Sequence, residues 1–268
     1  MSRRAVFIWA SLILFLNQIV AVITARSSAS LDQIFAQLCA VGIFQYMAWY
    51  TIFRLLGSSV RQQRARPIDA VVVTLLCLLV VLPAGQMVWL IATATAVYLC
   101  MFSNGDRKLR AAGTVLAALS MQQLWGHLFY NLVAFRLLRA ETAVVGSILQ
   151  ASGAGSVWQN NVITQPSGFG IVIFTECSSF HNLSVALLCW VTMSRLHGHS
   201  WSRRDFMFGA LVAATMVSFN ITRLSLMALS NDLYRYWHDG IGASVFAAGA
   251  SFTMLLLSLW AVKAQPQP

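Results

Sequence analysis

Three residues in the second half of the chain have side chains that together could carry out acyl transfer: Cys177, Arg223 and His238. A thiolate is a nucleophile toward carbonyl carbon, and an imidazole exchanges protons near neutral pH. A guanidinium can stabilise the oxyanion that forms when a carbonyl is attacked. Because the three residues are far apart in sequence, the fold has to bring them together.

The composition predicts the class of fold. Of 268 residues, 58% are hydrophobic and only 10% are charged, which leaves too little polar surface for a soluble globule. We expect an all-α integral membrane protein with a single polytopic domain over residues 1–268. Apolar runs suited to membrane spans predict eight helices: Ala5–Thr24, Ile34–Leu56, Ile68–Leu82, Gln86–Phe102, Ala111–Phe135, Phe180–Ser194, Phe206–Leu229 and Ser244–Val262.

The positive charge predicts the orientation in the membrane. The formal net charge is +10, and most basic residues lie in alternate connections: Arg3, Arg4, Arg54, Arg61, Arg64, Arg66, Arg107, Lys108, Arg110, Arg195, Arg203, Arg204 and Lys263. The positive-inside rule makes those connections and both termini cytoplasmic. This membrane topology accounts for the net positive charge, so binding to nucleic acid is not needed to explain it. The same topology places Cys177, Arg223 and His238 toward the outer surface. The arginines before the first run also fit a signal peptide, but the run is long enough to span and lacks a small-x-small cleavage site.

One outer connection, residues 136–179, is unusually long. Within it, Ala140–Gln150 predicts a short amphipathic helix at the interface. Val157–Ile163 and Phe169–Phe174 predict a β-hairpin, because they are rich in β-branched and aromatic residues and flank the turn signal Gln165–Gly168. This segment leads directly to Cys177.

Cys177 differs from the other four cysteines. Cys39, Cys77, Cys100 and Cys189 fall inside predicted spans, where cysteine acts as a small apolar residue. Cys177 instead precedes a helix at the outer boundary, where a helix N-terminus favours the thiolate. A packed boundary cysteine is the alternative interpretation.

Arg223 lies roughly 10 Å from the outer end of its predicted helix, at 1.5 Å per residue. An arginine at that depth is costly unless it faces a polar cavity or a partner, so a functional role is the default interpretation. Snorkelling to the interface is the alternative. Asn220, one turn earlier, could hold the guanidinium.

His238 falls in the last outer loop, where an isolated histidine is often merely solvated. His181 is closer to Cys177 in sequence and could replace His238 as the base. Glu176 could orient His238 or cap the following helix. Cys177, His181 and His238 lack the further ligand and the spacing of a zinc site, so we expect no metal, and no cofactor motif is present.

Taken in order, Glu176-Cys177-Ser178, Asn220-x-x-Arg223 and His238-x-x-x-Gly242 resemble the exosortase/archaeosortase family. The resemblance runs from about Ala111 to the C-terminus, with Ser179 where the family usually has glycine. It implies a membrane-embedded cysteine transpeptidase of the bacterial inner membrane, with its site facing the periplasm or exterior. Its partners would be exported proteins that end in a PEP-CTERM-like motif, a transmembrane helix and a basic tail.

The resemblance also implies the residue roles. Cys177 would form a thioester, His238 would move the proton, and Arg223 would stabilise the oxyanion. The sequence leaves open whether an amine or water resolves the thioester.

A polar stripe on the fifth predicted helix fits more than one function. Gln123, His127 and Asn131 recur every four residues and could form interhelical hydrogen bonds or line a substrate groove. A transporter or channel for an anionic solute could use Arg223 and this stripe, but the chain has no repeated halves and its polar residues gather at one leaflet. A scaffold without an active site is a third interpretation.

Overall fold

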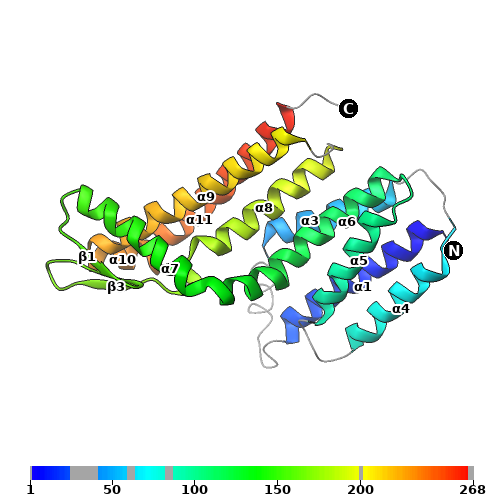
Figure 1. Ribbon diagram of the computed structural model, residues 1–268, viewed down its shortest axis with the longest axis horizontal. Coiled ribbons are helices and arrows are strands. Elements are labelled where there is room, and N and C mark those ends of the chain that lie inside the picture. The colour runs from blue at the N-terminus through cyan, green and yellow to red at the C-terminus, as the bar shows by residue number, and fades with distance from the viewer. Residues whose placement is uncertain (1, 25–41, 59–63, 82–86, 199–201, 265–268) are drawn as a thin grey trace. The chain divides into compact units, whose positions relative to one another are not determined.

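The computed structural model describes residues 2–24, 42–58, 64–81, 87–198 and 202–264. Within these ranges the protein is helical apart from one small three-stranded sheet (Figure 1). The chain divides into two compact units. The first comprises 1–125, 191–200 and 266–268, and the second comprises 126–190 and 201–265. Both Cys177 and the segments that carry Arg223 and His238 belong to the second unit.

The first unit is built from apolar helices that pack against one another: α1 (Arg3–Thr24), α3 (Ile43–Gly57), α4 (Pro67–Val81), α5 (Met87–Met101) and α6 (Arg107–Ser120). Asp106 begins α6, because its side chain accepts hydrogen bonds from the backbone N–H groups of Lys108 and Leu109. The π-helix η1 (Met121–Trp125) follows α6 directly.

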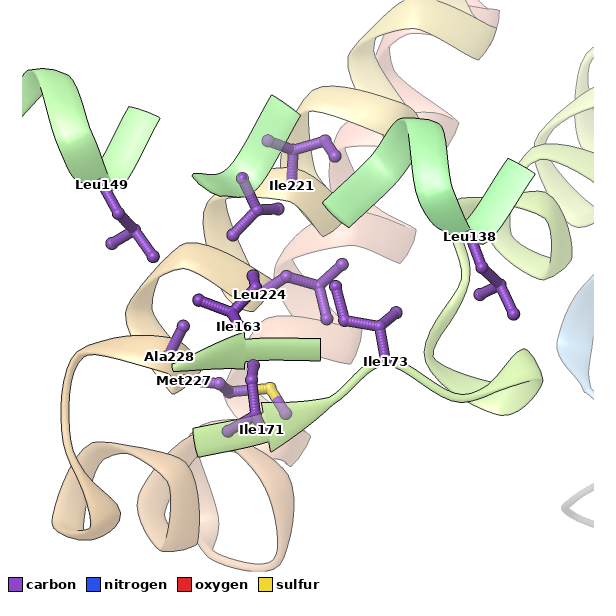
Figure 2. Packing of buried hydrophobic residues seen from close by; sticks show 10 residues of the cluster. Leu138, Leu149, Ile163, Ile171, Ile173, Ile221, Leu224, Met227 and Ala228 are labelled. Atoms are coloured by element: carbon purple, nitrogen blue, oxygen red, sulfur yellow. The ribbon is translucent and has the colours of Figure 1, made fainter. Parts of the chain in front are cut away.

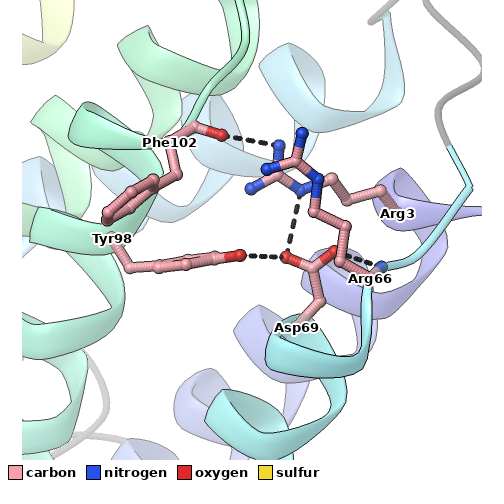
Figure 3. A network of polar contacts seen from close by, with 5 residues as sticks. All are labelled: Arg3, Arg66, Asp69, Tyr98 and Phe102. Carbon is pink, nitrogen blue, oxygen red and sulfur yellow. Dashed lines mark hydrogen bonds and ion pairs between the residues drawn. The ribbon is translucent and has the colours of Figure 1, made fainter.

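A buried ion pair between α1 and α4, with a hydrogen bond from α5, links three of these helices (Figure 3). Arg3 Nε donates to Asp69 Oδ1 at 3.0 Å, and its Nη1 donates to the carbonyl of Phe102 at 2.7 Å. Asp69 also accepts from the Tyr98 hydroxyl at 2.7 Å and from the Arg66 backbone N–H at 2.8 Å. Since Arg3 and Asp69 are 2% and 0% exposed, each charge depends on the other for compensation.

The second unit contains α7 (Gly126–Ala151), the strands β1 (Val157–Gln159), β2 (Val162–Thr164) and β3 (Gly170–Val172), and the 3₁₀-helix η2 (Thr175–Cys177). It continues with most of α8 (Ser179–Leu196), then α9 (Arg203–Leu229), α10 (Asn231–His238) and α11 (Ile241–Lys263). The strands form an antiparallel sheet in the order β1-β2-β3, with Ile163 opposite both Trp158 and Ile171. A capping box of Ser202 and Asp205 begins α9.

Three expectations for residues 140–163 and for His238 need correction. The predicted strand Val157–Ile163 is itself a hairpin, because Asn160 takes φ 56° and reverses the chain between β1 and β2. The predicted helix Ala140–Gln150 is the end of α7, since no proline interrupts the helix after Phe135 and Gly146 lies within it. His238 ends the helix α10 and does not lie in a loop. The turn predicted at Gln165–Gly168 is confirmed.

Three described helices are long and apolar enough to cross a membrane, over Arg3–Ala21, Arg203–Leu229 and Ile241–Lys263. Shorter apolar helices cover Pro67–Leu78, Val88–Met101 and Asn182–Leu196. The first part of the predicted span Ile34–Leu56 lies outside the described residues. The structure therefore supports an all-α membrane protein with three candidate spans among the described residues, and the predicted number of eight is not confirmed.

Candidate active site

The Cys177 turn, residues 175–179, connects the small sheet to α8. The backbone N–H of Ile173 donates to the carbonyl of Asn161 at 2.8 Å, which extends the β2–β3 pairing toward the turn. Cys177 closes η2, where its N–H donates to the carbonyl of Phe174 at 3.0 Å. The cysteine thus lies just before α8, at the start of a helix as the sequence predicted.

The turn rests on a hydrophobic core shared by α7, β2, β3 and α9, against which Cys177, Tyr234 and Trp237 also pack. Figure 2 shows this core, which contains Leu138, Val145, Leu149, Ile163, Ile171, Ile173, Ile221, Leu224, Met227 and Ala228. Alternate residues of β2 and β3 face it, because side chains alternate along a strand. The sheet thereby gives the cysteine segment a rigid support.

Asn220 anchors the Cys177 turn to α9. Its Nδ2 donates to the carbonyl of Cys177 at 2.8 Å and to Ser179 Oγ at 3.1 Å, and its Oδ1 accepts from Asn182 at 3.3 Å. Asn220 is 1% exposed. The expectation that Asn220 holds the Arg223 guanidinium is therefore replaced: its amide holds the cysteine segment.

Glu141 anchors the same turn from α7. Its Oε1 accepts from Ser178 Oγ at 3.0 Å and from the backbone N–H of Ser179 at 2.8 Å. Burial raises the pKa of Glu141, and the hydrogen bonds from the two serines oppose that rise. Ser178 caps α8, because its Oγ accepts from the N–H of Phe180 at 3.3 Å.

Arg223 lies one turn after Asn220 on α9 and is partly buried. Its Nε donates to the carbonyl of Trp237 at 3.1 Å, and its guanidinium lies 5.6 Å from the ring centroid of Phe246. The acceptor is one of the last carbonyls of α10, a position where a cation is favourable. Among the described residues, the two Nη groups have no hydrogen-bond acceptor, so they are available to another group.

His238 is fixed at the end of α10 by two neighbours. Its Nδ1 lies 2.6 Å from Asp239 Oδ1, and its ring stacks on Tyr234 with centroids 4.8 Å apart and planes inclined by 12°. With Nδ1–H donating to Asp239, Nε2 is left to accept a proton. Partial burial raises the pKa of Tyr234, and the charges of Asp239 and Cys177 add to the rise. Tyr234 thus stacks on His238 and packs on the same core as Cys177.

Gly242 allows α10 and α11 to approach closely. A Cβ at Gly242 would lie 2.6 Å from Tyr236 Cε1 and 2.8 Å from the Tyr236 carbonyl oxygen. Gly240 has the same restriction, with the Tyr236 carbonyl at 2.9 Å. The glycine of the His238-x-x-x-Gly242 pattern therefore sets the position of the helix that carries His238.

The structure describes the other predicted site residues only in part. Glu176, His127 and His181 have their backbones in η2, α7 and α8, while their side chains lie outside what is described. Gln123 falls in η1 of the first unit, and Asn131 lies exposed on α7. Because a π-helix interrupts the α-helical repeat, a four-residue spacing no longer keeps the whole stripe on one face.

The remaining cysteines agree with the apolar interpretation where the structure describes them. Cys189 is fully buried in α8, and Cys77 and Cys100 lie partly buried in α4 and α5. All three, like Cys177, are thiols that form no disulfide. Cys39 lies outside the described residues.

Sequence reasoning missed three residues of this site: Glu141, Tyr234 and Asp239. Glu141 contacts serines that follow it by 37 and 38 residues, and nothing in its local sequence indicates that link. Asp239 directly follows His238, so a search for a carboxylate beside the histidine could have found it. Tyr234 precedes His238 by four residues, and this spacing predicts a contact between the two side chains only if the segment is a helix.

The family model of the transmembrane exosortases matches residues 32–256 of this chain. A match of that extent establishes that the chain belongs to the transmembrane exosortase family. This family consists of membrane transpeptidases that act on the sorting signals of exported proteins. No curated protein and no solved structure matches the chain. The family assignment gives no support to a transporter or channel.

Proposed function

We propose that the protein is a cysteine transpeptidase that cuts the C-terminal sorting signals of exported proteins at the outer face of the bacterial inner membrane. One observation carries the proposal. Within one turn of α9, Asn220 holds the carbonyl of Cys177 and Arg223 holds the carbonyl beside His238. The single helix α9 therefore carries the guanidinium and holds both the segment with the cysteine and the helix with the imidazole.

In the proposed reaction, the Cys177 thiolate attacks the carbonyl carbon of the scissile peptide bond. A bond forms between Sγ and that carbon, and the carbonyl oxygen becomes an oxyanion. His238 accepts the thiol proton at Nε2 and passes it to the leaving amine as the C–N bond breaks. An incoming amine, or water, then resolves the thioester and releases the thiol.

The environment of Arg223 suits it to stabilise the oxyanion. Its Nε is already engaged with Trp237, which fixes the plane of the guanidinium. The Nη groups, which have no acceptor among the described residues, form a planar pair of donors whose charge counts for more in a partly desolvated site than in water. Glu176, His127 and His181 remain candidates for substrate or proton contacts, and His181 remains the rival base.

The substrates that this proposal names are exported proteins with a short C-terminal motif, a transmembrane helix and a basic tail, here called tailed substrates. The basic tail stays in the cytoplasm by the positive-inside rule, so the motif reaches the outer surface. Reporter fusions after Arg110 and Arg204 should then read cytoplasmic, and fusions at Gly155 and Asp239 should read external. An internal signal at Gly155 would contradict the proposed orientation.

The decisive experiment is to replace Cys177 by alanine and follow a co-expressed tailed substrate. Cys177→Ala should leave the substrate uncut at normal membrane levels of the enzyme. Cys189→Ala is the matched control, because Cys189 is a buried thiol in the same unit, and it should retain processing. Full processing by Cys177→Ala would remove the nucleophile assignment and favour a scaffold.

A further inference from the structure

Glu141 forms an unusual connection between α7 and the Cys177 turn. One of its oxygens, Oε1, accepts both hydrogen bonds from the turn, at 3.0 Å from Ser178 Oγ and 2.8 Å from the Ser179 N–H. The other oxygen, Oε2, is buried and has no hydrogen-bond partner among the described residues. Burying half of a carboxylate without a partner costs free energy.

Helix capping does not account for this carboxylate. Ser178 already caps α8 through the N–H of Phe180, and Glu141 also accepts from the Ser178 hydroxyl, which lies before the helix. Ser178 and Ser179 are themselves 1% and 3% exposed. The glutamate therefore contributes something beyond the first turn of the helix.

Two anchors hold the Cys177 turn, one from α7 and one from α9. Asn220 of α9 binds the Cys177 carbonyl and Ser179 Oγ, and Glu141 of α7 binds the Ser178 hydroxyl and the Ser179 N–H. Both helices also pack on the core beneath the sheet. With only one anchor the peptide groups around Cys177 could rotate, and the direction of the Cα–Cβ bond would change.

We propose that Glu141 is a positioning residue that fixes the orientation of the Cys177 thiol for attack. The role rests on the proposed function of Cys177, and it assigns the orientation of the nucleophile to a residue 36 positions earlier in the chain. The acceptor oxygen, and not the charge, performs this role. Glutamine should therefore replace Glu141, whereas alanine should not.

The first test measures processing of the tailed substrate by Glu141→Gln and Glu141→Ala. Alanine should lower kcat by up to about 10²-fold, the usual effect of displacing a reacting group by about 1 Å, and leave KM unchanged. Glutamine should restore most of kcat. Thr142→Ala is the matched control, since Thr142 is a buried polar neighbour on α7 whose hydroxyl donates only to Leu138 at 2.7 Å.

The second test needs no substrate. In a background without the other cysteines, the rate at which iodoacetamide alkylates Cys177 reports the position and state of the thiol. Glu141→Ala should change this rate while the thermal unfolding temperature stays near that of Thr142→Ala, and Glu141→Gln should match the parent.

The outcomes separate this proposal from the proposed function. An unchanged kcat and alkylation rate in Glu141→Ala would overturn the positioning role. Equal defects in Glu141→Gln and Glu141→Ala would overturn it as well, because the charge would then be what matters. Continued processing by Cys177→Ala would instead refute the nucleophile assignment, while the alkylation rates would still report on the turn.

Discussion

The side chain of Asn220 donates a hydrogen bond of 2.8 Å to the backbone carbonyl of Cys177, across 43 residues of sequence. Three residues further along α9, Arg223 donates to the carbonyl of Trp237 on α10. The separation between the cysteine turn and the histidine helix therefore depends on α9. Since a helix deforms little over one turn, changes on either side of α9 should affect catalysis through position.

Replacing Arg223 by lysine should cripple turnover. A compact ammonium on a flexible stem cannot hold both the Trp237 carbonyl and an oxyanion in a planar arrangement. Loss of one oxyanion donor typically lowers the rate by roughly 10² to 10³. Processing of the tailed substrate measures the loss, and alkylation of Cys177 should show a normally inserted protein. Arg235→Lys on α10 is the control and should behave as the parent, whereas normal turnover by Arg223→Lys would show that charge alone suffices.

Asp239 should support catalysis through the orientation of His238. Asp239→Ala removes the acceptor that lies 2.6 Å from Nδ1, so kcat should fall. The fall should be smaller than the roughly 10² to 10⁴ that a general base contributes. Asp239→Asn should be intermediate, because an amide oxygen still accepts from Nδ1–H. Asp232→Ala in the first turn of α10 is the control for general effects on that helix. An Asp239→Ala variant as active as this control would show that Asp239 does not orient His238 for catalysis.

Gly242→Ala should displace α10 and the histidine it carries. The new methyl group would meet the Tyr236 backbone at 2.8 Å, and a side-chain rotation cannot relieve that contact. Both kcat and the unfolding temperature in detergent should fall. Gly249→Ala supplies the comparison within α11, since nothing lies within 4 Å of its Cβ position, and helix propensity should make it neutral or slightly stabilising. Equal behaviour of the two variants would argue against the close approach.

The ion pair of Arg3 and Asp69 should matter for stability, because both groups are buried in the first unit. Asp69→Leu removes the carboxylate that pairs with the buried Arg3 and should cost about 3–5 kcal/mol. The double variant Arg3→Met/Asp69→Leu should recover much of that loss, since it removes both charges. Thermal unfolding in detergent measures both effects. A single variant as stable as the parent would mean that water compensates the charge.

Composition and local pattern determined a large part of this protein. The apolar content indicated a membrane protein, and the runs around Ala5–Thr24, Phe206–Leu229 and Ser244–Val262 correspond to the three clear spans. The three motifs that contain Cys177, Arg223 and His238 indicated the exosortase family, which the family match confirms. These features can be predicted from the sequence because each depends on residues that are close together in the chain. The catalytic roles themselves stay predictions.

Only the tertiary structure decided how the site is held. Asn220 binds the Cys177 turn and not Arg223, and Glu141 reaches the same turn from α7. Both are contacts between segments about 40 residues apart, and no periodicity or spacing marks such a pair in a single sequence. Which side chains hold the Cys177 turn depends on the helix faces that pack on the core around Ile163 and Ile171. That packing determines which polar side chains come within hydrogen-bonding distance.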